Sequence, residues 1–255
     1  MTAIREHPAQ IRPAANQTGA EASPRPNLLI GLSILSAAGL LAGLVLALTY
    51  AGTDAIQGDV QRLFYFHVPS IMGAFVAFTL GLIGSLGYLF TNRASWDRLA
   101  LAAIEVGFVL ALINVLLGSI WARPTWNTWW TDDPRMVASA VMMLICLAYL
   151  MLRHGLPDGN RRVAAVLGIV LMGAVIATFL ITRLRADTIH PVVIGPSPQN
   201  SDNVFGMTPP MGITFGFNMA VWALLLAPTL IWWRVRLERL AERVNRLNRG
   251  ERANQ

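Results

Sequence analysis

Apolar residues in this 255-residue chain come in six long runs that are separated by short polar stretches. The runs cover residues 28–50, 68–90, 99–120, 136–152, 163–182 and 211–233. A bilayer core of about 30 Å needs roughly 20 apolar residues in helical form, and each run is close to that length. The pattern therefore predicts an all-α, polytopic membrane protein in which residues 28–233 form a membrane domain of six transmembrane helices.

The segments on either side of this membrane domain follow a different pattern. Residues 1–27 are polar, are rich in Pro, Ala and Arg and show no periodicity, so we expect a disordered tail. In residues 234–255, apolar residues recur among arginines at a helical spacing, which predicts a basic amphipathic helix. These apolar residues are Leu237, Leu240, Val244 and Leu247. Such a helix fits either an anionic membrane surface or a cytoplasmic partner subunit, and the sequence leaves both open.

Composition and charge support the membrane assignment and add an orientation. Only 13% of the residues are charged, about half the share in a soluble domain, and the mean hydropathy is +0.51. The net charge of +6 does not indicate a nucleic-acid partner, because the arginines lie in the tails and short loops. With the amino terminus inside, fifteen of the 20 arginines lie inside, and the five outside are Arg62, Arg123, Arg135, Arg183 and Arg185. The positive-inside rule therefore predicts cytoplasmic termini and a multi-pass protein of the inner (plasma) membrane.

With this orientation, two long loops face outward, at residues 121–135 and 183–210. The first contains four of the eight tryptophans: Trp121, Trp126, Trp129 and Trp130. One interpretation is an interfacial aromatic belt. The other is a platform for a large, flat, apolar ligand, with Arg123 and Arg135 as candidates to pair with carboxylates on its rim.

The segment around the tryptophans, GSIWARPTWNTWWTDDPRM, resembles the tryptophan-rich WWD signature of the haem-handling proteins of cytochrome c assembly. The matching positions are Trp121, Trp126, Trp129, Trp130, Asp133 and Arg135. Asp132 stands where the signature usually has another tryptophan, Ala122 where it has glycine, and Met136 where it has leucine. Six spans with this segment between the third and the fourth make the chain similar, over nearly all of its length after residue 27, to the cytochrome c maturation protein C (CcmC) family.

The resemblance implies a haem-binding membrane component of cytochrome c maturation rather than an enzyme. Such a protein holds non-covalent haem b on the outer face and passes it to the haem chaperone CcmE. The implied partners also include the small subunit CcmD and an ABC transporter of CcmA and CcmB. The chain has no G-x-x-x-x-G-K-[ST] phosphate loop, so any ATP hydrolysis belongs to a partner. Its single cysteine, Cys146, is not part of a C-x-x-C-H string, which argues against covalent haem attachment of the usual c type.

Two histidines flank the tryptophan segment on the outer side. His67 lies in RLFYFHVPS at the start of the second run, and His190 lies in DTIHPVV in the second long loop. A single interfacial histidine is more often a hydrogen-bonded surface group than a ligand. Two imidazoles on opposite faces of a haem, however, give a six-coordinate iron, and the resemblance implies this pair as the axial ligands. We expect His7 and His154 to be ordinary solvated residues.

Two other functions remain open from the sequence. A membrane-bound b-type cytochrome that exchanges electrons with quinone also uses two histidines, although its ligands usually lie within facing helices. A solute transporter is expected to have polar or interrupted spans near the midplane, whereas these spans are mostly apolar apart from Glu105 and Asn114. Glu105, an ionisable residue within the third run, is a functional candidate to which the sequence assigns no role.

Overall fold

The computed structural model describes residues 26–155, 160–192 and 206–253, and within these ranges the chain is helical and has no strand. Six helical segments are long and apolar enough to cross a membrane, which confirms the predicted fold class. They are Asn27–Tyr50, Asp59–Thr91, Ala94–Trp126, Pro134–Gly155, Arg161–Leu184 and Pro209–Asn245. Most of the predicted disordered tail and residues 193–205 of the second long loop lie outside the described residues. The orientation of the termini stays a prediction.

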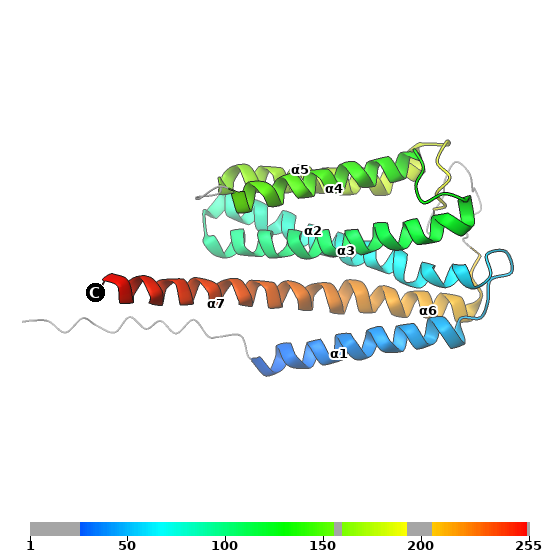
Figure 1. The fold of residues 1–255 in the computed structure, drawn as a ribbon, viewed down its shortest axis with the longest axis horizontal. Helices are drawn as coiled ribbons and strands as arrows, with labels where there is room; N and C mark the ends of the chain where they lie inside the picture. Colours follow the sequence, from blue (N-terminus) through cyan, green and yellow to red (C-terminus); the bar gives the residue numbers. More distant parts are fainter. Residues whose placement is uncertain (1–25, 156–159, 193–205, 254–255) are drawn as a thin grey trace, which may run out of the picture.

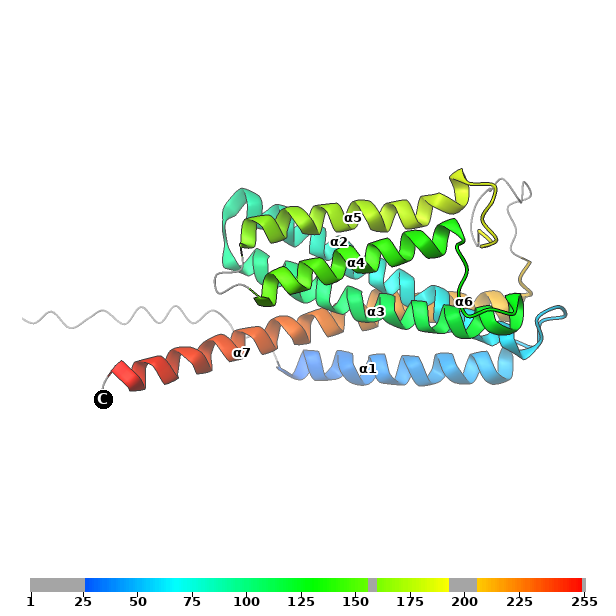
Figure 2. The ribbon, with the colours of Figure 1, turned by 45° about the horizontal axis from the view of Figure 1, so that its top comes forward.

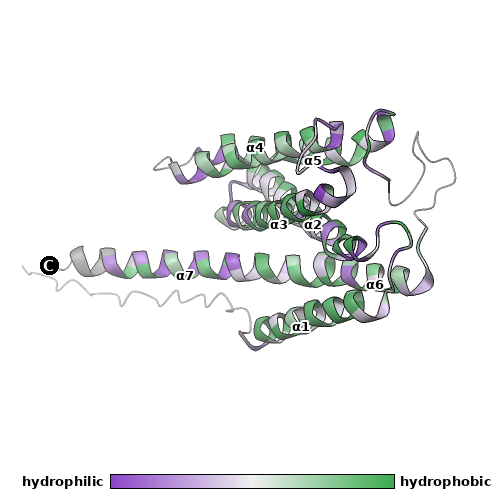
Figure 3. Ribbon diagram, turned by 45° about the vertical axis from the view of Figure 1, so that its right-hand side comes forward, coloured by the Kyte–Doolittle hydropathy of each residue, from purple (hydrophilic) through white to green (hydrophobic). Residues whose placement is uncertain are grey.

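The helices lie roughly parallel in layers (Figures 1 and 2). They are α1 (Pro26–Val45), α2 (Phe64–Thr91), α3 (Ala94–Trp126), α4 (Pro134–Gly155), α5 (Arg161–Leu184), α6 (Pro209–Ala220) and α7 (Ala227–Ala253). Helices α2 and α3 form the middle layer. Helices α4 and α5 pack on one side of this layer, and α6, α7 and α1 lie on the other side. A continuous core of buried apolar side chains joins α2, α3, α4, α5 and α7. Most of the helical ribbon has a hydrophobic colour in Figure 3. Many large hydrophobic side chains of these helices are exposed, as expected for surfaces that face lipid.

Glycines on one face of α2 explain why α2 and α3 pack closely. A Cβ atom on Gly84 would lie 2.6 Å from the backbone nitrogen of Ala100, and one on Gly87 would lie 2.5 Å from the Trp96 ring. A Cβ atom on Gly81 would lie 2.8 Å from Ile104. Because apolar surface gains little by leaving lipid, small residues that allow close van der Waals contact hold such helices together.

Several helices are longer than the apolar runs that predict them. Helix α3 continues through Trp126 and ends where Asn127 adopts a left-handed conformation, with φ of 56°. The turns that carry Trp121 and Trp126 are therefore helical, and the connection to α4 is shorter than the predicted loop 121–135. Similarly, α2 begins at Phe64, so that His67 lies inside its first turn rather than before it.

The sixth span and the basic carboxyl-terminal segment form one unbroken helical rod. A short π-helical segment, Val221–Leu226, joins α6 to α7, and α7 extends beyond the other helices (Figures 1 and 2). Hydrophilic and hydrophobic residues alternate along its far half (Figure 3). Leu237, Leu240, Val244 and Leu247 are all exposed there.

Ion pairs fasten the helices at one end of the bundle, which we call the charged end. Asp97 at the start of α3 accepts a hydrogen bond of 3.0 Å from Arg153 of α4 and lies 3.6 Å from Arg161 of α5. Arg98 lies 3.3 Å from Glu242 of α7. The charged end therefore ties α3 to α4, α5 and α7, and it is also the end at which α1 begins and α7 leaves the bundle (Figure 1).

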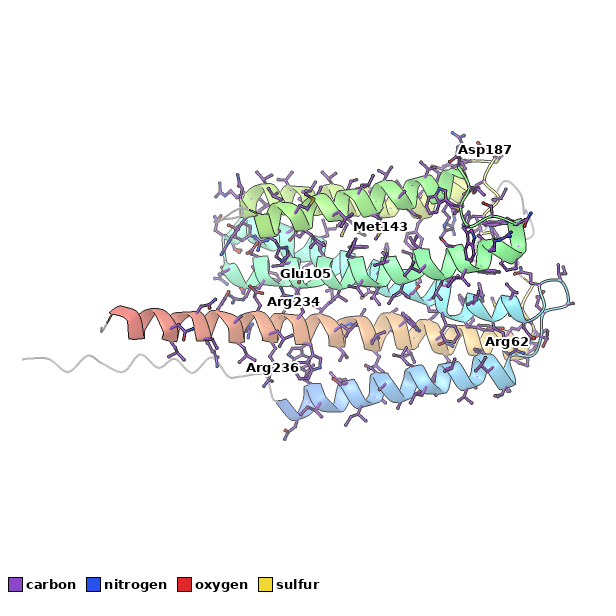
Figure 4. All side chains as sticks on the ribbon, in the orientation of Figure 1. Arg62, Glu105, Met143, Asp187, Arg234 and Arg236 are labelled. Atoms are coloured by element: carbon purple, nitrogen blue, oxygen red, sulfur yellow. The ribbon has the colours of Figure 1, made fainter. Side chains whose placement is uncertain are left out.

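Glu105 belongs to the same set of contacts, one or two turns further into α3. Its carboxylate lies 2.5 Å from Arg234 of α7, toward which it points in Figure 4. It also lies 3.4 Å from His154 of α4. Arg234 also pairs with Glu238, at 2.6 Å. An acidic side chain within a span needs such partners, so these contacts give Glu105 a structural role between helices.

Candidate binding site between two histidines

A cavity of about 510 Å³ lies among α2, α3, α4, α5 and α6, and His67 and His190 both line it. We call this part of the bundle, away from the charged end, the site end. The other polar and aromatic residues in its wall include Asn114, Trp121, Trp126, Trp130, Arg135 and Arg183. The apolar side chains in the wall include Val68, Ile71, Phe215 and Met219. A mostly apolar cavity of this size with a few convergent polar groups is typical of a site for a small molecule or a cofactor.

His67 is held by α3 through its Nδ1 atom. This nitrogen lies 2.9 Å from the backbone oxygen of Asn114, which can only accept a hydrogen bond. The side-chain amide of Asn114 lies 3.1 Å from the same nitrogen and donates to the backbone oxygen of His67 at 2.7 Å. This arrangement favours the tautomer with the proton on Nδ1, so that the Nε2 lone pair is left available to a ligand.

The ring of His67 also lies directly against the backbone of α3. A Cβ atom on Gly118 would come within 2.8 Å of the Cε1 atom of His67, so glycine makes room for the ring. The ring of Trp121 meets the imidazole edge-on, with centroids 5.7 Å apart and planes at 80°. The indole nitrogen of Trp121 donates to Gln57 at 2.8 Å, which fixes the indole in turn.

His190 is held by a carboxylate. Its Nδ1 atom lies 2.8 Å from Asp133, the aspartate of the WWD-like segment. Asp133 also accepts hydrogen bonds from the Thr188 hydroxyl at 2.8 Å and the Ile189 backbone at 2.7 Å. The ring of Trp126 packs against His190, with centroids 5.0 Å apart and planes at 70°. Each of the two histidines therefore has one helix-borne tryptophan beside it and an acceptor behind its Nδ1 atom.

The electrostatics of the second pair follow from burial and from nearby charges. Burial lowers the pKa of His190, and the Arg135 guanidinium lowers it further, although Asp133 acts in the opposite direction. For Asp133, burial opposes ionisation, but the hydrogen bonds from Thr188 and Ile189 together with His190 lower the pKa of its carboxyl overall. At neutral pH, Asp133 is therefore ionised and His190 is a neutral imidazole that donates its Nδ1 proton to the carboxylate.

Only some of the residues predicted for the haem-binding platform line the cavity. Trp121, Trp126, Trp130 and Arg135 line the cavity, whereas Asp133 lies behind His190. Trp129 is 58% exposed and Arg123, also exposed, donates to the side chain of Asn127; neither is part of the cavity wall.

Three further residues of the wall were not predicted as site residues. Arg183 follows the fifth apolar run and brings a second positive charge to the cavity beside Arg135. The only signal in the sequence was an arginine at the outer end of that run. Asn114 and Gly118 were not recognisable because their roles depend on contact with His67, which is far from both in the sequence.

Fold and site together define a class: a helical membrane protein with an apolar cavity walled by two oriented histidines, aromatic rings and arginines. The family model described as Heme exporter protein C matches residues 23–247, and the chain belongs to this family. It is similar to the Heme exporter protein C of Rhodobacter capsulatus, with 32% identity over 140 residues that cover 54% of this chain and 57% of the relative.

Other relatives show a similar degree of likeness. The Heme exporter protein C of Paracoccus denitrificans is 33% identical over 126 residues, which cover 49% of this chain and 52% of the relative. The Heme exporter protein C of Escherichia coli K12 is 29% identical over 149 residues, which cover 56% of this chain and 59% of the relative. The alignments thus span little more than half the length of the curated relatives.

Proposed function

We propose that this protein binds haem in the cavity between His67 and His190, as a membrane component of cytochrome c maturation. The observation that carries the proposal is that both histidines line one cavity while an acceptor engages the Nδ1 atom of each. Metal-ligating histidines are commonly held in this way, because a second contact fixes both the tautomer and the orientation of the ring. Haem iron takes up to two such imidazoles, one on each face of the porphyrin.

The remaining wall fits haem better than a bare metal ion. Among the described residues, no group of three or more His, Cys, Asp or Glu side chains comes together to hold an ion. A porphyrin brings its own equatorial nitrogen ligands, so two histidines complete its coordination. Flat apolar surface is provided by Phe64, Phe215 and the cavity tryptophans, while Arg135 and Arg183 suit the carboxylates of haem.

In this proposal, the protein binds haem in order to transfer it and does not retain it as a permanent cofactor. The family name, Heme exporter protein C, supports a role in haem movement. We propose non-covalent haem b, handed to the chaperone CcmE, with CcmD and the ABC transporter of CcmA and CcmB as partners. Trp130 lines the cavity and is 40% exposed, so it provides apolar surface next to the ligand, where a receiving protein has to approach; the neighbouring Trp129 is also exposed.

The proposal includes an orientation in the inner membrane. The asymmetry of the arginines supports an orientation with the site end outside and the charged end in the cytoplasm. Single cysteines at Thr125 and Asn160, both exposed, test this in a Cys146→Ala background. In intact cells, an impermeant thiol reagent should label the variant at position 125 and spare the variant at position 160 until the cells are opened. The reverse labelling would place the cavity in the cytoplasm.

A b-type cytochrome that reacts with quinone would use the same pair of ligands, so the test must separate the two functions. The purified protein should carry haem that acidified organic solvent extracts completely, and it should lose this haem to added haem chaperone. Quinol should not reduce the bound haem at a catalytic rate. Quinone-coupled turnover without transfer would favour the cytochrome, and a preparation that neither retains nor takes up haem would refute both functions.

A further inference from the structure

The carboxylate of Asp133 is buried at the site end, where it has four hydrogen-bond partners. Its Oδ1 atom lies 2.8 Å from His190 Nδ1 and 2.9 Å from the backbone nitrogen of Arg135. Its Oδ2 atom lies 2.8 Å from the Thr188 hydroxyl and 2.7 Å from the backbone nitrogen of Ile189. Only 7% of the residue is exposed, so water contributes little to its solvation.

The two backbone contacts show that the carboxylate oxygens of Asp133 act as hydrogen-bond acceptors. A backbone N–H group can only donate, and one of them reaches each oxygen of Asp133. Both oxygens therefore act as acceptors, and the remaining contact with His190 is completed when the imidazole donates its Nδ1 proton. The Nε2 atom of His190 then keeps its lone pair.

His67 is supported differently. Its Nδ1 atom faces the backbone oxygen of Asn114, a neutral acceptor, and no carboxylate contacts it among the described residues. An imidazole that donates to a carboxylate carries more negative charge on its free nitrogen than one that donates to an amide carbonyl. The two histidines of the cavity are thus chemically unequal, although they are the same residue type.

We propose that Asp133 is a positioning residue that holds His190 with its proton on Nδ1 and thereby makes His190 the stronger of the two axial donors to haem iron. The inference rests on the proposed haem-binding function. It gives the aspartate of the WWD-like segment a role behind a ligand, outside the cavity wall. Second contacts of this kind to metal-ligating histidines, and hydrogen bonding around haem, tune both affinity and reduction potential.

The alternative is that Asp133 only fastens residues 188–190 to the start of α4. Two variants separate these roles. Thr188→Val removes the hydrogen bond that the hydroxyl donates to Asp133 and the one that it accepts from the His190 backbone, but it keeps the contact between carboxylate and imidazole. Asp133→Asn keeps the size of the side chain but removes its charge. A fastening role predicts that both variants behave alike, whereas the positioning role predicts that only Asp133→Asn changes the electronic properties of the site.

The test uses full-length protein loaded with haem. Asp133→Asn should lose roughly 10–100-fold in haem affinity, the usual effect of removing such a partner, and should raise the reduction potential because the ferric state loses electron donation. Asp132→Asn is the matched control: it removes the same charge from the neighbouring, exposed residue, and it should change neither quantity. Thr188→Val should leave the potential at its wild-type value. Equal potentials in wild type and Asp133→Asn would overturn the proposal.

A measurement on the haem-free protein keeps this result separate from the proposed function. With ¹⁵N-labelled histidine, the ring resonances of wild-type His190, assigned by comparison with His190→Ala, should report protonation on Nδ1. In Asp133→Asn the Nε2-protonated form should appear as well. A wild-type His190 with its proton on Nε2 would refute the role of Asp133 even if haem binds. A wild-type protein that does not bind haem would refute the proposed function instead.

Discussion

At the charged end, acidic side chains meet arginines, whereas at the site end the buried acidic side chain meets a histidine and the arginines line a cavity. Asp97 is satisfied by Arg153 and Arg161 from two other helices. Asp133 is satisfied by His190 and by hydroxyl and backbone donors. Aspartates therefore join helices at the charged end and orient a cavity-lining histidine at the site end. The arginines that pair with Asp97 hold helices together, whereas Arg135 and Arg183 line the cavity, where they can contact a bound molecule.

We therefore expect variants at the two ends to behave differently. Changes at the charged end should lower the free energy of unfolding but leave His67 and His190 in their positions in the cavity wall. Changes at the site end should alter haem binding and leave the fold largely intact.

The largest effect is expected from Asp97→Asn. The side chains of Asp97 and Arg153 are only 7% and 9% exposed, and a buried charge left without its partner costs about 3–5 kcal/mol. Thermal unfolding in detergent should therefore show a marked loss of stability, while any molecules that remain folded keep a wild-type haem spectrum.

A second variant at the same place provides the control. Replacing both Asp97 and Arg153 by leucine removes both charges and should recover much of the lost stability, because no unpaired charge stays buried. If Asp97→Asn is as stable as the wild type, the ion pairs of the charged end do not fasten the bundle.

An intermediate effect is expected from Gly118→Ala at the site end. The added methyl group would lie 2.8 Å from His67, so the ring or the helix has to move. Overpacking of this kind typically costs about 1–3 kcal/mol, and haem affinity should fall by roughly tenfold or more. Gly173→Ala is the matched control, because nothing lies within 4 Å of its Cβ position. Equal haem titrations for both variants would show that the close contact with His67 is unimportant.

A smaller effect should distinguish two tryptophans of the same segment. Trp126 contacts the His190 ring, and an aromatic contact of this geometry contributes about 0.5–1.5 kcal/mol beyond its buried area. Trp126→Ala should therefore weaken haem retention several-fold. Trp129→Ala removes an exposed side chain outside the cavity wall and should change retention little, even if it weakens transfer to a chaperone. Similar retention in the two variants would favour the aromatic-belt interpretation.

The fold was largely predictable because each span is a nearly uninterrupted apolar run. Hydropathy alone located all six helices, but it misplaced their ends, since polar and aromatic residues continue several of them. Helix α3 extends through Pro124 to Trp126, and its end is set by the left-handed backbone of Asn127. Such an end depends on local backbone conformation, which a hydropathy pattern does not contain.

The site was predictable only in part. The sequence and its resemblance indicated His67 and His190, and the structure brings both into one cavity wall; their role as haem ligands stays a prediction. The acceptors behind them were not predictable, because Asn114 reaches His67 across 47 positions and Asp133 reaches His190 across 57. Contacts between residues so far apart arise only when the helices pack.

The most direct test of the central claim, that His67 and His190 together hold haem, is a haem titration followed by absorption spectroscopy. The wild type should give the spectrum of a six-coordinate haem with two imidazole ligands. His67→Ala and His190→Ala should each lose that spectrum and bind haem more weakly, although both variants fold. His154→Ala, which changes an exposed histidine at the charged end, should match the wild type. Wild-type spectra and affinities in both His67→Ala and His190→Ala would contradict the account.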